Sequence, residues 1–271
     1  MRFRSSTPGL ALIALALAAC SSASPITSRS TPAPSASLPP LRTIADRCGD
    51  PAVSAKVFWF PAADGTQLDG AIVGSGSKAI ILLHEYPADL CGWWPFAVSI
   101  ARHGYRVLLF DFRCYGVSTC PRSLRGRYLD DVQGAVAIMR TEGAKRVGLV
   151  GASLGGTVSL MSAATLEPQV DAVVSVSGEP SLIYISGTPE LDTATYLPRL
   201  VVPTMFLVSK GDTTVSVEDT QAMYRATAAK AKEIHVFESG YAHGWSMFVG
   251  GDPAGTKPGR LILAFLASHL R

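Results

Sequence analysis

Short apolar runs typical of strands alternate with helix-like segments from about Cys48 onward, and this alternation constrains the fold most strongly. Strand-like runs occupy 56–60, 67–73, 79–83, 106–110, 147–150, 172–176, 203–208 and 233–237, and helix-like segments occupy 93–102, 128–140, 154–166, 217–229 and 258–270. The run 79–83 is apolar throughout, as suits a strand that is buried on both faces. The alternation predicts an α/β fold with a mostly parallel sheet and helices on both of its faces.

Two local features add detail to this prediction. The first two strand-like runs flank an Ala63-Asp64-Gly65 turn, which predicts an antiparallel hairpin at the N-terminal edge of the sheet. The short stretch between the runs at 172–176 and 203–208 leaves room for little or no lid. The 271 residues, 48% of them hydrophobic, are enough for one large domain with a buried core.

Gly151-Ala152-Ser153-Leu154-Gly155 matches the pattern G-x-S-x-G, and it lies between a strand-like run and a helix-like segment. In this context the motif predicts a sharp strand-to-helix turn that presents a nucleophilic serine at the sheet's carboxyl edge. The helix N-terminus behind Ser153 favours developing negative charge. The alternative interpretation is a glycine-rich turn in which Ser153 only caps the helix.

An acid and a base follow in the order expected for a Ser-acid-His triad. Asp212 comes just after the run at 203–208, and His243 lies in a loop after the last strand-like run, next to Gly244. His103, His235 and His269 fall within predicted helices or strands. Glu179, after the run at 172–176, is the alternative acid. Such a triad allows His243 to take the Ser153 proton while the acid orients the imidazole.

With these residues, the chain resembles the α/β-hydrolase family from about residue 57 to residue 270, and within it the dienelactone-hydrolase-like group. The resemblance rests further on His84-Glu85-Tyr86 after a strand and on the turn Asp111-Phe112-Arg113-Cys114-Tyr115-Gly116, where Cys114 replaces the family's glycine. It implies an oxyanion hole formed by backbone N–H groups of Leu154 and of Glu85 or Tyr86. It also implies structural roles for His84, Asp111 and Arg113, and leaves the role of Glu85 open.

We therefore expect a serine hydrolase that cleaves a small-molecule carboxylic ester through an acyl–Ser153 intermediate and needs no cofactor. A serine peptidase or amidase is the alternative, because fold and triad alone do not separate these activities. A third interpretation is a binding lipoprotein without turnover. Trp93 and Trp94 are candidates for lining the substrate site. The sequence does not reveal the acyl chain, the alcohol or the oligomeric state.

The N-terminus has the pattern of an export signal: Arg2 and Arg4 precede an apolar run at 9–19 that is too short to span a bilayer. Leu17-Ala18-Ala19-Cys20 resembles a bacterial lipobox, which implies cleavage before Cys20 and lipidation of that residue. We predict a signal peptide at 1–19, a disordered Ser/Pro/Ala-rich tether at 20–47 and the hydrolase domain at 48–271. The protein would be extracytoplasmic and anchored to the membrane by its lipid, or otherwise secreted.

Besides Cys20 the chain has four cysteines, which permit two disulfides in an exported protein. Of the three possible pairings, Cys114 with Cys120 is the local choice, and it leaves Cys48 with Cys91. No cysteine or histidine cluster has zinc spacing, so we predict no metal site. The formal net charge of +3 is small and not clustered, which gives nucleic-acid binding no electrostatic support.

Overall fold

The structure, a computed structural model, describes residues 38–121, 127–183 and 189–271. The chain divides into two units, Met1–Pro39 and Pro40–Arg271, and the fold described here is that of the second unit. The predicted signal peptide, Cys20 and the tether up to residue 37 lie outside the described residues. Among the described residues, no helix combines the length and the apolar character needed to cross a membrane.

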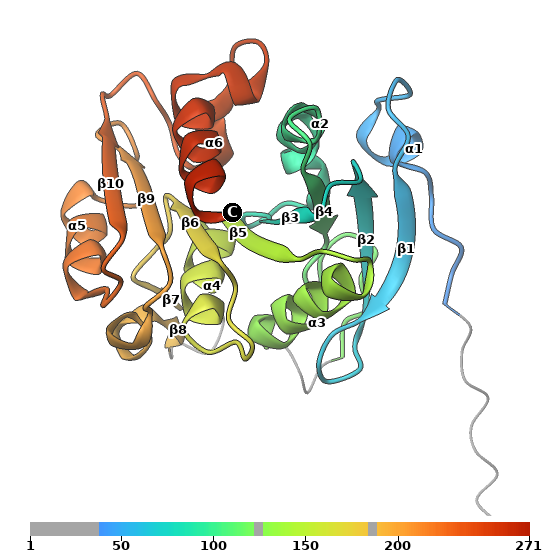
Figure 1. Cartoon of the computed structure of the whole chain (residues 1–271), viewed down its shortest axis with the longest axis horizontal. Coiled ribbons are helices and arrows are strands. Elements are labelled where there is room, and N and C mark those ends of the chain that lie inside the picture. The colour runs from blue at the N-terminus through green and yellow to red at the C-terminus, as the bar shows by residue number, and fades with distance from the viewer. Residues whose placement is uncertain (1–37, 122–126, 184–188) are drawn as a thin grey trace, which may run out of the picture. The chain divides into compact units, whose positions relative to one another are not determined.

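An eight-stranded sheet in the order β1-β2-β4-β3-β5-β6-β9-β10 forms the centre of the fold (Figure 1). Its strands are β1 (Lys56–Pro61), β2 (Gln67–Val73), β3 (Lys78–Leu83), β4 (Arg106–Phe110), β5 (Arg146–Ala152), β6 (Ala172–Val176), β9 (Thr204–Ser209) and β10 (Lys232–Phe237). β2 runs antiparallel to both β1 and β4, whereas all neighbours from β4 to β10 are parallel. The mostly parallel sheet and its antiparallel N-terminal hairpin confirm the predicted fold class.

Helices cover both faces of this sheet (Figure 1). The helices are α1 (Ile44–Cys48), α2 (Trp94–Ala101), α3 (Tyr128–Thr141), α4 (Leu154–Ala163), α5 (Val217–Ala226) and α6 (Lys257–His269). The core on one face includes residues of α3, α4 and α5, and the core on the other includes residues of α1, α2 and α6. Both faces of β3 are therefore buried, which explains why its residues from Ala79 to Leu83 are all apolar and at most 1% exposed.

The folded unit begins at Pro40 and not at the predicted Cys48, because it includes helix α1. Thr43 caps this short helix by accepting a hydrogen bond from the Asp46 N–H, and Ile44 is buried in the core. The Arg47 guanidinium forms ion pairs with the buried carboxylates of Asp69 and Asp111. The tether predicted at 20–47 therefore extends too far along the chain, because it includes most of α1. A helix of five residues is too short to show helical periodicity in the sequence.

Small elements between β6 and β9 occupy the stretch in which we expected little or no lid. β7 (Ser181–Ile183) and β8 (Pro189–Asp192) pair as a separate antiparallel sheet, followed by the 3-10 helices η3 (Thr193–Thr195) and η4 (Leu197–Arg199). The predicted helices beginning at residues 154 and 217 end three residues earlier than expected, at Ala163 and Ala226. The 3-10 helix η1 (Leu90–Trp93) precedes α2, and η5 (Gly244–Phe248) and η6 (Pro253–Gly255) precede α6.

The four cysteines of the folded unit form two disulfides, Cys48–Cys91 and Cys114–Cys120. The first links α1 to η1, and the second closes the turn after β4. Cys114 has a φ of 68°, a left-handed conformation in which glycine is unstrained. This conformation accounts for the glycine at the corresponding position of the family pattern that the turn resembles.

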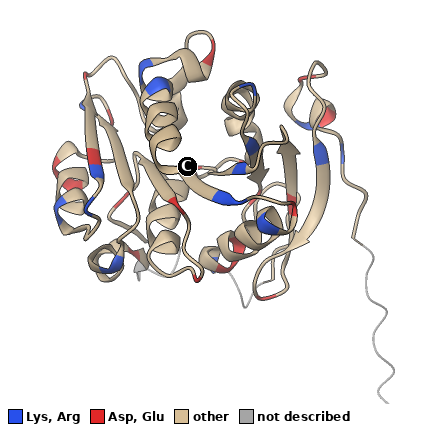
Figure 2. Cartoon of the chain, in the orientation of Figure 1, with Lys and Arg blue, Asp and Glu red and all other residues tan. Residues whose placement is uncertain are grey.

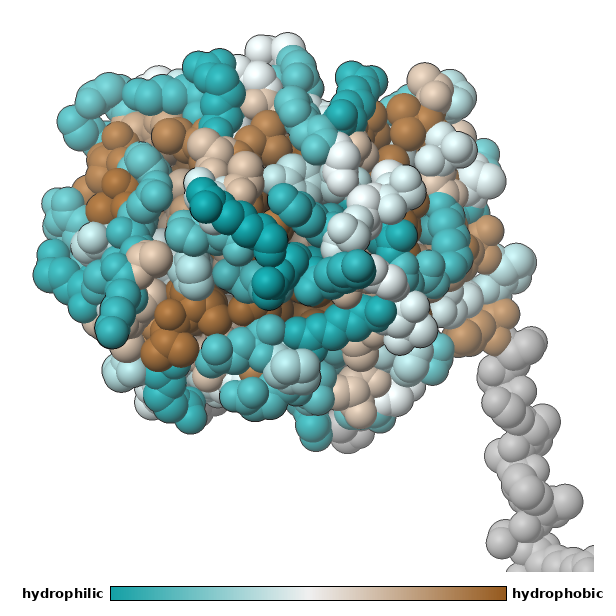
Figure 3. Space-filling view, viewed as in Figure 1, coloured by the Kyte–Doolittle hydropathy of each residue, from teal (hydrophilic) through white to brown (hydrophobic). Residues whose placement is uncertain are grey.

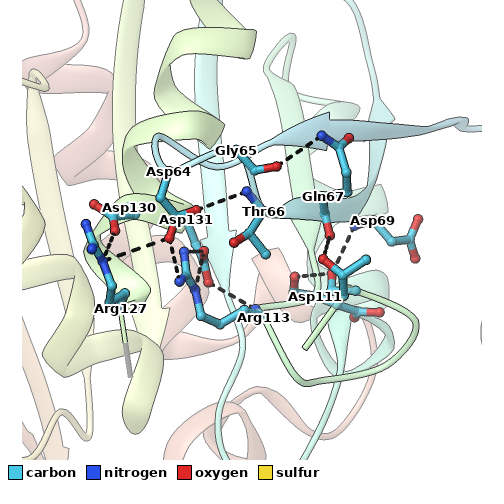
Figure 4. A network of polar contacts seen from close by, with 12 residues as sticks. Asp64, Gly65, Thr66, Gln67, Asp69, Asp111, Arg113, Arg127, Asp130 and Asp131 are labelled. Atoms are coloured by element: carbon cyan, nitrogen blue, oxygen red, sulfur yellow. Dashed lines mark hydrogen bonds and ion pairs between the residues drawn. The ribbon is translucent and has the colours of Figure 1, made fainter. Parts of the chain in front are cut away.

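The turn after β4 is also stabilised by buried charges (Figure 4). Arg113, whose side chain is fully buried, pairs with Asp131 at 2.6 Å and with Asp64 at 2.8 Å. Asp111 accepts a hydrogen bond from the Leu90 N–H at 2.8 Å in addition to its ion pair with Arg47. These contacts tie the turn to α3, the first hairpin and η1, as expected of structural residues.

The surface carries charges of both signs. Positions of Lys and Arg and positions of Asp and Glu are interspersed along the ribbon (Figure 2). On the face seen in Figure 3, hydrophobic residues are visible as separate patches between hydrophilic ones.

Candidate active site

The loops that carry the predicted site residues leave the sheet at one edge. β3, β5, β6, β9 and β10 are successive neighbours and run parallel, so their carboxyl ends lie together. These ends are followed in turn by Glu85, Ser153, Glu179, Asp212 and His243. Residues that are far apart in the sequence are brought together here by the topology of the sheet.

Ser153 occupies a strained turn between β5 and α4. Its φ and ψ are 48° and −118°, a conformation that residues with a side chain rarely adopt. The turn is possible because the residues two positions before and after Ser153 have no Cβ: a Cβ on Gly151 would lie 2.0 Å from the Gly155 carbonyl oxygen, and one on Gly155 would lie 2.1 Å from that of Leu83. The Ser153 N–H donates to the Val176 carbonyl at 2.9 Å, which fixes the turn to β6.

Asp212 and His243 form a direct contact. His243 Nδ1 lies 3.0 Å from Asp212 Oδ1 and 2.8 Å from Oδ2. The Asp212 side chain is fully buried, and Oδ1 also accepts the N–H groups of Thr214 and Val215. Burial raises the pKa of Asp212, but hydrogen bonds from His243, Val215, Ser177 and Thr214 outweigh it and leave the pKa at about 2. Asp212 is therefore ionised at neutral pH.

Three carboxylates surround the His243 imidazole. Burial alone would lower the pKa of His243, but the hydrogen bond to Asp212 and the charges of Asp212, Glu85 and Glu179 raise it above its ordinary value. The contact through Nδ1 leaves Nε2 as the atom that can exchange a proton with a nucleophile or leaving group. The site thus favours the protonated imidazolium that a general base forms during reaction.

Among the described residues, the acceptor of the Ser153 hydroxyl is Glu179 and not His243. The distance between Ser153 Oγ and Glu179 Oε1 is 3.4 Å, which is a long and weak hydrogen bond. The Glu179 N–H in turn donates to Thr157 Oγ1 at 2.9 Å, so the backbone of this loop is fixed to α4. Glu179, the alternative acid in the sequence, therefore contacts the serine, whereas Asp212 contacts the histidine.

Glu85 lies against the loop that carries His243. Its Oε2 accepts the Trp245 N–H at 3.3 Å, and a Cβ on Gly244 would lie only 1.8 Å from the same oxygen. Burial raises the pKa of Glu85 to about 7, although the Trp245 N–H and the charge of His243 oppose the shift. Glu85 is therefore partly protonated near neutral pH.

The predicted oxyanion residues lie where two loops meet α4. Leu154 is the first residue of α4, so its N–H has no acceptor within the helix. Glu85 and Tyr86 follow β3, the neighbour of β5, and a Gly155 Cβ would touch the Leu83 carbonyl at the end of β3. The backbone groups after β3 are thus close to the turn that carries Ser153.

The two tryptophans predicted to line the site have different surroundings, although both are buried. Trp94 donates its indole N–H to Asp50 at 2.9 Å and packs in the core, which does not support a role in substrate contact. Trp93 donates to the Leu83 carbonyl at 2.8 Å. Its ring lines a pocket of about 300 Å³ together with Phe96, Trp245 and Phe248, among others.

His84 has a structural role, as predicted. Its ring is fully buried, Nε2 accepts the Phe112 N–H at 3.0 Å, and Nδ1 lies 2.9 Å from the Glu85 carbonyl oxygen. Burial lowers the pKa of His84, so the ring is neutral and joins the ends of β3 and β4.

No group of three or more His, Cys, Asp or Glu side chains in the described part of the chain has a geometry suited to a metal ion.

Ser177, which follows β6, is a further residue of the site: its Oγ accepts the Gly244 N–H, and its hydroxyl contributes to lowering the pKa of Asp212. No motif marks this serine. Its contacts depend on the adjacency of β6 and β9, which is visible only once the strand order is known.

Comparisons with known proteins agree with this architecture. Residues 78–186 match a family model described as alpha/beta hydrolase fold. The esterase Pf2001 of Pyrococcus furiosus has a similar structure, with a TM-score of 0.69 at 20% identity over 84% of this chain and 94% of that chain. An esterase of Exiguobacterium antarcticum gives a TM-score of 0.64 at 18% identity over 78% and 100% of the two chains. The chain therefore has the α/β-hydrolase fold.

Sequence relatives match a shorter part of the chain. An uncharacterized protein of Escherichia coli, YfhR, is 31% identical over 113 residues, which are 38% of this chain and 39% of that protein. A 2-hydroxy-6-oxononadienedioate/2-hydroxy-6-oxononatrienedioate hydrolase of Burkholderia vietnamiensis is 30% identical over 120 residues, 42% of each chain. The chain spans about two fifths of the length of the curated relatives it matches.

Proposed function

We propose that this protein is a serine hydrolase that cleaves carboxylic esters, with Ser153 as nucleophile, His243 as base and Asp212 as the residue that orients the base. The observation that carries the proposal is the Asp212–His243 contact at the same sheet edge as a serine on a strained turn before a helix. Similar structures include those of esterases, and one of Est1E from Butyrivibrio proteoclasticus holds ferulic acid.

The reaction begins when the Ser153 hydroxyl leaves Glu179 and turns to His243 Nε2. The imidazole takes the hydroxyl proton as Oγ forms a bond to the ester carbonyl carbon. The carbonyl oxygen becomes an oxyanion, for which the N–H groups of Leu154 and of Glu85 or Tyr86 are the proposed donors. Two such donors contribute several kcal/mol of transition-state stabilisation.

Collapse of the tetrahedral intermediate expels the alcohol, which receives the proton from His243. A water molecule then gives its proton to the same nitrogen and attacks the acyl–Ser153 carbonyl, releasing the carboxylic acid and the free enzyme. Asp212, ionised with a pKa of about 2, stabilises the imidazolium in both halves of the reaction. These residues suffice for the chemistry, and the proposal includes no metal or cofactor.

We further propose that the protein works outside the cytoplasm, with a lipid on Cys20 holding it to a membrane. The support for this part of the proposal is the N-terminal sequence: a basic start, a short apolar run and the lipobox-like Leu17-Ala18-Ala19-Cys20. The two disulfides of the folded unit are consistent with an oxidising compartment.

The decisive experiment combines covalent labelling with turnover. A fluorophosphonate probe is expected to label the protein once, at Ser153, and the enzyme should hydrolyse p-nitrophenyl esters of graded chain length. Ser153→Ala should abolish labelling and reduce kcat by about 10⁴-fold or more. Ser268→Ala, which changes an exposed serine on α6, should behave as the unaltered protein does.

Three results would contradict the proposal. Labelling or turnover that survives Ser153→Ala would exclude Ser153 as the nucleophile. Faster turnover of a matched peptide or amide panel than of esters would assign the protein to the peptidases or amidases. An absence of labelling and of turnover in the unaltered protein would favour a binding protein.

A further inference from the structure

Ser177 adopts a backbone conformation that is unfavourable for serine. It follows β6 directly and has a φ of 49°, and its N–H donates to the Leu207 carbonyl at 2.8 Å. Glycine adopts such a φ without strain, whereas a residue with a Cβ does not. A serine at this position therefore costs conformational energy of the backbone. The contacts of its hydroxyl can explain why a serine occupies the position.

The hydroxyl of Ser177 faces two separate parts of the site. Its Oγ accepts the Gly244 N–H at 3.1 Å. The same hydroxyl contributes to lowering the pKa of the Asp212 carboxyl, as a group that can donate to the carboxylate does. A hydroxyl group has one proton to donate and lone pairs to accept with, so it can serve both groups at once. Ser177 itself is fully buried and does not reach the solvent from which a substrate would enter.

We propose that Ser177 is a positioning residue that holds the Asp212–His243 pair in register through this bridge between Asp212 and the Gly244 N–H. The inference rests on the proposed function of His243 and Asp212. One end of the bridge fixes the carboxylate, and the other fixes the peptide unit that links His243 to Gly244. Ser177 thereby sets the distance between Asp212 and His243, which must stay in contact. Ser177 itself touches neither the nucleophile nor the substrate.

A second group, the Glu85 carboxylate, also holds the loop around His243. Gly244, with a φ of 54°, leaves no room for a Cβ because Glu85 Oε2 would lie 1.8 Å away. Glu85 also accepts the following N–H, that of Trp245. The N–H groups of Gly244 and Trp245 are thus held by the Ser177 hydroxyl and the Glu85 carboxylate, and losing the hydroxyl frees the first of them.

Three variants separate the hydroxyl from the backbone. Ser177→Ala removes the hydroxyl and keeps the strain, whereas Ser177→Gly removes both. Ser175→Ala is the matched control: Ser175 lies two positions earlier, in β6, it is 1% exposed, and its Oγ has no hydrogen-bond partner among the described residues. We expect both Ser177 variants to lower kcat about 10-fold with KM changed less than about twofold, because one hydrogen bond to a charged group is lost and no substrate contact is. The control should retain its kcat.

Proton NMR of the Nδ1–H shared by His243 and Asp212 gives a second readout that a merely structural serine would not affect. In the unaltered protein this proton should give a low-field signal that is protected from exchange. In Ser177→Ala and Ser177→Gly the signal should broaden or move upfield, and in Ser175→Ala it should not change. If Ser177→Ala fails to fold, Ser177→Gly still decides, since it relieves the strained φ.

Unchanged kcat and an unchanged low-field signal in both Ser177 variants would overturn the inference. Loss of activity in Ser177→Ala that Ser177→Gly restores would also overturn it, because the backbone and not the hydroxyl would then matter. If the unaltered protein hydrolyses no ester, the proposed function fails, but the NMR comparison still tests whether Ser177 positions the His243–Asp212 contact.

Discussion

At the scale of single residues, three carboxylates lie around one imidazole, yet they have different partners. Asp212 contacts His243 Nδ1, Glu179 contacts the Ser153 hydroxyl, and Glu85 contacts the backbone after His243. Only the first contact fixes the tautomer that leaves Nε2 free to accept a proton. The geometry thus favours Asp212 over Glu179 as the residue that orients the base.

This division of roles predicts different effects of two similar substitutions. Asp212→Asn should lower kcat about 10⁴-fold, because an amide holds the wrong tautomer and does not stabilise the imidazolium. Glu179→Gln should lower kcat about 10-fold at most, since an amide oxygen still accepts the Ser153 hydroxyl. Steady-state kinetics on one ester checks both variants. A larger loss of kcat for Glu179→Gln would identify Glu179, in the loop after β6, as the residue that orients the base.

Glu85 gives a prediction about pH and stability. Its pKa is raised by burial from 4.5 to about 7 in the folded protein. The fold therefore favours the protonated carboxyl, and stability that is present below pH 4.5 is lost as the pH rises through 7. Glu85→Gln, which resembles the protonated form, should match the unaltered protein near pH 4.5 and exceed its stability by about 1–3 kcal/mol near pH 8.

Thermal or urea unfolding at the two pH values measures this difference. Glu218→Gln is a suitable control, because Glu218 is an exposed residue of α5. A stability gain that is the same at both pH values, or larger at the lower pH, would show that Glu85 is ionised throughout the range.

The site residues differ in how far the sequence alone could predict them. The sequence alone marks Ser153, Asp212 and His243. Each lies beside glycines or just after a strand-like run, and they follow one another in the Ser-acid-His order expected for a triad. Ser177 has no such mark, since its role arises from a strained φ and from partners 35 and 67 positions away. The sequence likewise does not show that Asp50 accepts the indole N–H of Trp94.

At the scale of secondary-structure elements, burial decides what is predictable. The central strands β3, β4, β5, β6 and β9 are mostly apolar and buried on both faces, and each of the eight strand-like runs in the sequence corresponds to an observed strand of the main sheet. Elements of three to five residues, such as α1 and β7, are too short to show a period. Arg47 of α1 is polar and resembles a tether residue in the sequence, although its guanidinium is 7% exposed.

Helix α1 is expected to stabilise the domain through that arginine. Arg47→Gln leaves the buried carboxylates of Asp69 and Asp111 without their cation, which should lower the free energy of unfolding by about 3 kcal/mol and the melting temperature by about 10 °C. Arg42→Gln is the matched control, since Arg42 is exposed and, among the described residues, hydrogen-bonds only the Asp46 carbonyl. Calorimetry on both variants tests the difference, and equal melting temperatures would mean that the ion pairs of Arg47 contribute nothing to stability.

At the scale of the whole molecule, the strand order explains how a site forms from distant segments. Five neighbouring parallel strands end at one edge, and each contributes a loop to the same place. The strand-like and helix-like pattern predicts that such an edge exists, because helices must connect parallel strands across the sheet. It does not predict which side chains meet there, since Glu179 and Asp212 both follow neighbouring strands and only coordinates tell them apart.

The folded unit begins at Pro40, which places a stretch of about 20 residues rich in Ser, Thr, Ala and Pro between it and Cys20. If Cys20 carries lipid chains, their buried methylenes, at about 0.8 kcal/mol each, would hold the protein to a membrane.

This arrangement predicts where the protein is found after expression in an exporting cell. The unaltered protein should partition into detergent with the membranes, and mass spectrometry of its N-terminal peptide should find Cys20 with acyl chains. Cys20→Ala should block this processing, because no thiol remains to be modified, and should leave a precursor or a chain cut elsewhere and released. Ser21→Ala, one position further on, should keep the lipid. Unaltered protein found only in the soluble fraction, with an unmodified N-terminus, would exclude the anchor and leave secretion as the remaining route.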